Sequence, residues 1–114
     1  MGDGDRNGIL ISITTAEATK LVLERLQRAG HIVARANAGG RKGGVRLLPA
    51  GWPDVVGFSS DRGLFVGVEI KVRKDDRLRA AQVLFRDHLL AAGGLWHEWR
   101  GVESFSAWCE ENGL

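Results

Sequence analysis

The stretch from Leu64 to Val72 constrains the fold more than any other part of the sequence. Its even-numbered positions are all apolar, and they are Leu64, Val66, Val68, Ile70 and Val72. Because side chains alternate between the two faces of a β-strand, this pattern predicts a strand with one apolar face. Glu69 and Lys71 then project together from the opposite face. The stretch therefore predicts a sheet that presents a carboxylate and an amine on one surface.

A second strand is predicted just upstream, over residues 54–58, and the polar, glycine-containing segment after it has the composition of a hairpin turn. If Ser60 and Gly63 flank a two-residue turn, Asp54 lies opposite Glu69 on the same face. A three-residue loop with a bulge is equally natural for this sequence. A slip of one residue would put the two carboxylates on opposite faces. The sequence leaves both registers open.

The rest of the pattern predicts a single α/β domain in which helices flank a mixed central β-sheet, in the order α-β-β-β-α-β-α. The predicted helices cover residues 15–29, 78–92 and 102–112, and the last strand covers residues 95–99. A chain of 114 residues with 44% hydrophobic content suits one core. We expect residues 1–13 to form a flexible leader and residues 14–114 to form the domain.

The polar residues of the two strands suggest phosphodiester hydrolysis. Asp54 and Glu69 could hold Mg²⁺ or Mn²⁺, which prefer oxygen ligands and keep several waters. Such an ion supplies a hydroxide at neutral pH, and Lys71 beside it could orient the attacking water or stabilise negative charge. The simpler alternative is that Glu69 and Lys71 form a solvated strand face and that Asp54 only begins a strand.

Taken together, Gly51-x-Pro53-Asp54, Glu69-Ile70-Lys71 and a following Gln82 resemble the PD-(D/E)XK nuclease superfamily, and specifically its virus-type replication-repair nuclease (VRR-NUC) branch. The resemblance covers roughly residues 16 to 105. Further matches are Glu17, the Arg35-x-Asn37-x-Gly39 stretch and the Gly93-Gly94 pair.

The resemblance implies a divalent-metal-dependent DNA nuclease of the restriction-endonuclease-like fold. Asp54, Glu69 and Lys71 take the superfamily's catalytic positions, and Ile70 adds a backbone carbonyl ligand. Gln82 would hydrogen-bond the attacking water, Lys71 or a phosphate oxygen. Compact members of this branch are similar to Holliday-junction resolvases and tend to act as homodimers, so duplex or branched DNA is the expected substrate.

Glu17 has two interpretations. The segment Thr14-Thr15-Ala16-Glu17 fits a capping box, in which Glu17 bonds back to the Thr14 amide at the start of a helix. Glu17 could equally aim toward the site as an auxiliary metal ligand. The sequence does not separate the two.

Basic residues gather in sequence around the proposed site, as binding to a polyanion requires. The candidate DNA contacts are Arg35, Asn37, Arg41, Lys42, Arg46, Arg73 and Lys74. The glycine-rich segment 39–44 lacks the Gly-Lys-Ser/Thr of a nucleotide-triphosphate loop, so it is interpreted as a basic loop that closes on DNA or as an incidental hairpin connection.

Several classes of protein are disfavoured. Cys109 is the only cysteine, which rules out an intrachain disulfide and a cysteine-based zinc site. No stretch approaches the roughly 20 apolar residues of a membrane span, and we expect a cytoplasmic protein. Two alternatives to a nuclease remain open: a catalytically silent DNA-binding module, and a metal-free structural protein in which Glu69 pairs with Lys71.

Overall fold

The computed structural model describes residues 13–36 and 48–114. Its elements are α1 (Thr15–Arg28), β1 (Ile32–Arg35), β2 (Val55–Phe58), β3 (Phe65–Ile70), α2 (Ala80–Ala91), β4 (Leu95–Trp99) and α3 (Val102–Glu111). This order confirms the predicted α-β-β-β-α-β-α fold class. Nearly all of the expected leader, residues 1–12, and the glycine-rich segment 39–44 lie outside the described residues.

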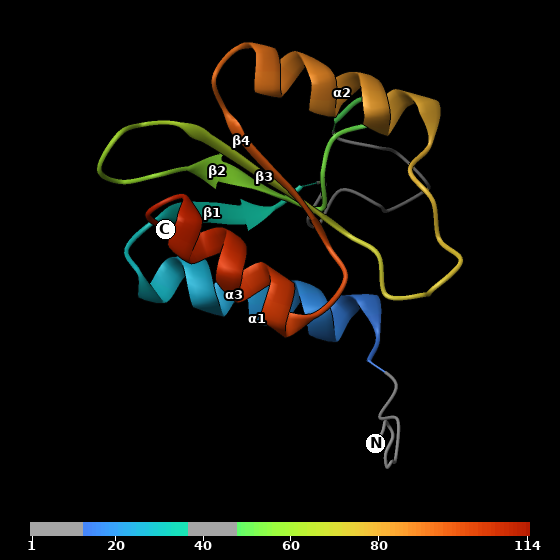
Figure 1. The fold of residues 1–114 in the computed structure, drawn as a ribbon, viewed down its shortest axis with the longest axis horizontal. Coiled ribbons are helices and arrows are strands. Elements are labelled where there is room, and N and C mark those ends of the chain that lie inside the picture. The colour runs from blue at the N-terminus through green and yellow to red at the C-terminus, as the bar shows by residue number, and fades with distance from the viewer. Residues whose placement is uncertain (1–12, 37–47) are drawn as a thin grey trace.

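The four strands form one mixed sheet in the order β1-β2-β3-β4. β1, β2 and β3 are antiparallel neighbours, whereas β4 runs parallel to β3 because α2 carries the chain back across the sheet. α1 and α3 cover one face of the sheet and α2 covers the other (Figure 1). No helix in the described part of the chain is long and apolar enough to cross a bilayer.

The β2–β3 hairpin adopts the register that brings the two carboxylates together. Val55 pairs with Val68, so the next position toward the site places Asp54 opposite Glu69. This is the register that a two-residue turn would give, one of the two alternatives that the sequence left open, but the loop is wider. The Ser59 N–H donates to the Leu64 carbonyl and the Gly63 N–H donates to the Ser59 carbonyl, each at 2.9 Å, so residues 60–63 form the loop. Within it, the backbone N–H of Ser60 donates to His31 Nδ1 at 3.2 Å.

The core lies between the sheet and the α1/α3 layer. The predicted apolar face of β3 is buried there as Val66, Val68 and Ile70. They pack in one cluster with Ala18, Val22, Leu26, Val33, Val55, Trp99, Phe105, Cys109 and Leu114. Burying each large side chain of this kind contributes roughly 1.5–3 kcal/mol. This cluster anchors β3, the strand that ends in the proposed site.

The backbones of the paired strands β1 and β2 lie so close together at Gly57 that there is no room for a side chain there. A Cβ placed there would lie 1.9 Å from the carbonyl oxygen of Ile32, which is backbone and cannot rotate away. We therefore expect Gly57→Ala to lower the free energy of unfolding by about 3 kcal/mol or to prevent folding, because the two strands must separate. Urea denaturation measures this change. Ser60→Ala, an exposed substitution in the adjoining hairpin loop, should leave the midpoint unchanged.

Candidate active site

Asp54 lies immediately before β2, and just upstream of it the chain passes close beneath α2. Gly51 has a φ of 98°, and a Cβ there would lie 2.5 Å from the carbonyl oxygen of Ala81. Only glycine permits this approach. The Asp54 carboxylate then accepts a hydrogen bond from the backbone N–H of Ile70 at 2.8 Å. This bond fixes Asp54 against β3, beside Glu69.

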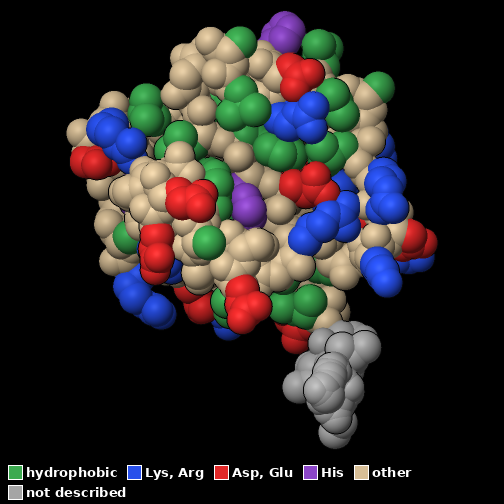
Figure 2. Space-filling view, viewed as in Figure 1, with side chains coloured by type: hydrophobic (Ala, Val, Ile, Leu, Met, Phe, Trp, Pro, Cys, Tyr) green, Lys and Arg blue, Asp and Glu red, His purple; other side chains and the backbone are tan. Residues whose placement is uncertain are grey.

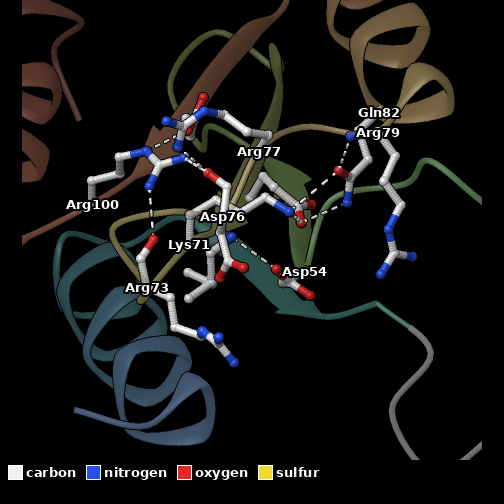
Figure 3. Close-up of polar contacts among 11 residues, drawn as sticks. Asp54, Lys71, Arg73, Asp76, Arg77, Arg79, Gln82 and Arg100 are labelled. Atoms are coloured by element: carbon white, nitrogen blue, oxygen red, sulfur yellow. Dashed lines mark hydrogen bonds and ion pairs between the residues drawn. The ribbon is translucent and has the colours of Figure 1, made fainter. Parts of the chain in front are cut away.

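Glu69 lies on the face of β3 that α2 covers, and its side chain is only 6% exposed. Gln82 Nε2 donates to Glu69 Oε2 at 2.8 Å, and Lys71 Nζ lies 3.6 Å from the same oxygen. Lys71 Nζ also donates to Gln82 Oε1 at 3.3 Å. Figure 3 shows these contacts. The structure therefore joins Glu69, Lys71 and Gln82 in one polar cluster, next to Asp54.

Gln82 connects this cluster to the first turn of α2. Its Oε1 accepts a hydrogen bond from the backbone N–H of Arg79 at 2.8 Å, which satisfies a group that the helix itself cannot bond. The same side chain therefore caps the helix and holds Glu69. Its orientation is fixed from both ends.

The pKa of Glu69 is raised from its ordinary value of 4.5 to about 7. Burial is the largest cause, and the charge of the Asp54 carboxylate adds to it, while Lys71 opposes both. The Asp54 carboxylate thus lies close enough to Glu69 to disfavour its charge. A cation bound beside both carboxylates would relieve this repulsion.

The donors at this point suit a hard divalent ion. Asp54, Glu69 and the Ile70 carbonyl supply oxygen only, and Mg²⁺ is commonly held by one or two carboxylates while waters complete its shell. Within residues 13–36 and 48–114 there is no group of three or more His, Cys, Asp or Glu side chains that could hold a metal. A three-carboxylate site that includes Glu17 is therefore not formed in this structure.

Glu17 forms the predicted capping box of α1. Its carboxylate accepts from the Thr14 backbone N–H at 2.8 Å, and its own N–H donates to Thr14 Oγ1 at 3.0 Å. The hydrogen bonds to Thr14 also lower the pKa of Glu17. The capping interpretation accounts for this residue fully, and a role as a metal ligand stays a prediction.

The candidate DNA contacts are only partly described. Arg35 ends β1 beside the strand end that carries Asp54, since the backbone N–H of Ala36 donates to the Asp54 carbonyl at 2.9 Å. Arg73 and Lys74 are exposed in the loop between β3 and α2. Asn37, Arg41, Lys42 and Arg46 lie outside the described residues.

Arg77, one of the basic residues that follow the site in the sequence, and Arg100, which no pattern in the sequence analysis pointed to, lie on the same side of the site. Arg100 follows β4, and the parallel register pairs Ile70 with Trp99, so Lys71 and Arg100 leave adjacent strands at the same edge. A signal was present in the sequence. Two strands joined by one helix predict a parallel pair, and the residues after such strands meet at one edge.

No family model, curated protein or solved structure matches this chain.

Proposed function

We propose that this domain is a divalent-metal-dependent DNA endonuclease of the PD-(D/E)XK kind. The observation that carries the proposal is the convergence of Asp54, Glu69, Lys71 and Gln82, from two neighbouring strands and a helix, into one largely buried polar cluster. Stability alone does not account for a buried carboxylate beside another carboxylate. A binding site for a cation and a phosphate would account for this arrangement.

Each residue has a role in this proposal. Asp54, Glu69 and the Ile70 carbonyl would hold Mg²⁺ or Mn²⁺, which when bound polarises a water and offsets charge on the phosphate. Lys71 lies beside Glu69 and places a cation where negative charge develops on the scissile phosphate. Gln82 fixes Glu69 and Lys71 relative to each other.

Duplex or branched DNA is the proposed substrate, with four-way junctions included. The described part of the 12.4 kDa chain carries one such cluster, and cutting two strands symmetrically requires two centres, so a homodimer belongs to the proposal. A cytoplasmic location belongs to it as well.

The test is cleavage of linear duplex, single strand, flap and four-way junction, each with Mg²⁺, Mn²⁺ or EDTA. We expect metal-dependent cutting by the wild type and cutting by Asp54→Asn that falls to the level seen in EDTA. Asp61→Asn, an exposed acid in the hairpin loop, is the matched control and should cut like the wild type. If the wild type binds DNA in a salt-sensitive way and never cuts, the chain is a silent binding module instead.

A further inference from the structure

We propose that the hollow beside Lys71 is a phosphate subsite. It holds a backbone phosphate that neighbours the scissile phosphate on the same DNA strand. The hollow measures about 550 Å³ and is lined by Lys71, Val72, Arg73, Lys74, Arg77 and Arg100. It is called the basic hollow below. This inference rests on the proposed nuclease function. The DNA strand that is cut in the active site would be bound at a second point, in the basic hollow.

The wall of the basic hollow carries five cationic side chains and one apolar one. Lys and Arg side chains gather at the right-hand edge of Figure 2, where Figure 1 places the loop between β3 and α2. Asp75 lies 3.7 Å from Arg73, but both side chains are more than 70% exposed, so this pair offsets little of the charge. Among the described residues, no carboxylate lies within ion-pair distance of Lys74 or Arg77.

Arg100 fixes the shape of the basic hollow. Its guanidinium donates to the backbone carbonyls of Arg73 and Asp76 and to the Glu98 carboxylate, as Figure 3 shows in part. Arg77 donates in turn to the carbonyls of Lys74 and Asp76, each at 3.0 Å. The loop is therefore tied to β4 and to itself. A cationic wall that is already ordered loses little entropy when it binds an anion.

The basic hollow adjoins the candidate active site through a shared residue. Lys71 contacts Glu69 and Gln82 on one side and lines the basic hollow on the other. A strand whose scissile phosphate lies beside Lys71 would therefore bring a neighbouring phosphate to Lys74 and Arg77. Cationic side chains are the groups that bind phosphates and fix the register of a strand.

The experiment compares the wild type with the double variant Lys74→Gln/Arg77→Gln and with Lys20→Gln, which removes an exposed charge from α1. The probe is a dumbbell duplex with no free ends, and affinity is measured by fluorescence anisotropy in EDTA over a series of NaCl concentrations. We expect the double variant to raise the Kd about tenfold and to lower the slope of log Kd against log salt by about 1, as for one lost phosphate contact. Lys20→Gln should change neither quantity.

An unchanged Kd and slope in the double variant, with a thermal midpoint equal to that of the wild type, would overturn the subsite. A loss seen only with linear DNA that carries a 5′-phosphate would also overturn it, in favour of recognition of strand ends. Cleavage of the dumbbell and of the linear, flap and four-way-junction substrates with Mg²⁺ separates the two proposals. If the wild type cuts any of them and the double variant binds like the wild type, only the subsite is wrong. If the double variant shows the expected loss of binding and the wild type cuts none of them, only the nuclease is wrong.

Discussion

Glu69→Gln is expected to raise the thermal stability of the metal-free protein and, at the same time, to reduce metal-dependent DNA cleavage by about a thousandfold. The two effects have opposite signs because the fold and the reaction need different forms of this side chain. Its pKa of about 7 means that the folded surroundings disfavour the charge, even with Lys71 beside it. The proposed reaction requires that charge in order to hold the metal.

The gain in stability follows from the size of the pKa shift. A rise from 4.5 to about 7, which already includes the attraction of Lys71, corresponds to an expected gain of about 3 kcal/mol well above pH 7. For a domain of this size, that raises the melting midpoint by about 10 °C. The glutamine can keep the contact with Gln82, since its oxygen accepts from Gln82 Nε2 as the carboxylate does.

Melting at pH 8 in EDTA and cleavage with Mg²⁺ measure the two effects. Glu103→Gln, an exposed glutamate in the first turn of α3, is the matched control and should alter neither. A Glu69→Gln protein that melts below the wild type would show that Glu69 serves the fold as the partner of Lys71, the structural alternative. A Glu69→Gln protein that melts above the wild type and still cuts DNA would show that Glu69 is not part of the active site.

Local patterns in the sequence were sufficient for the order of the elements and for the two faces of β3. The alternation from Leu64 to Val72 predicts the buried face of β3, and the structure buries Val66, Val68 and Ile70 there. The spacing of Asp54 and Glu69 allows the observed register but does not select it. The structure shows the register through the pairing of Val55 with Val68 and the bond from the Ser59 N–H to the Leu64 carbonyl. The loop is also held by His31, from a distant part of the chain, which accepts the N–H of Ser60.

The features of the site that the sequence did not predict depend on contacts between residues far apart in the chain. The sequence places Glu69 and Lys71 on one face, but it does not show that α2 covers this face and removes Glu69 from water. Gln82 was recognised as a candidate, whereas its double role as a helix cap and as a donor to Glu69 depends on how α2 packs. Arg100 lies 29 residues beyond Lys71, and only the parallel pairing of their strands brings them together.

The contribution of Glu69 to the stability of the metal-free protein is expected to fall as the pH rises from about 5 to 8, most steeply between 4.5 and 7, at about 1 kcal/mol per pH unit. The folded pKa, about 7, lies above the ordinary value of 4.5, so the folded state binds more protons in this range. The stabilising contribution is complete below about 4.5 and is lost as the pH rises through about 7. His97 acts in the opposite direction, because burial lowers its pKa and its protonation opposes folding.

The difference between wild type and Glu69→Gln isolates the carboxylate, because both proteins carry the same His97. We expect this difference in unfolding free energy, measured by urea titration in EDTA, to grow with pH and to level off above about pH 8. Mg²⁺ that binds Glu69 must displace the proton of that side chain, so its apparent affinity should rise about tenfold per pH unit below 7 and flatten above that value. Asp54→Asn should lower the affinity and weaken this dependence, because burial, the largest cause of the raised pKa of Glu69, remains. A Mg²⁺ affinity that stays constant from pH 5.5 to 7 would place the ion away from the two carboxylates, because binding there cannot avoid releasing the proton.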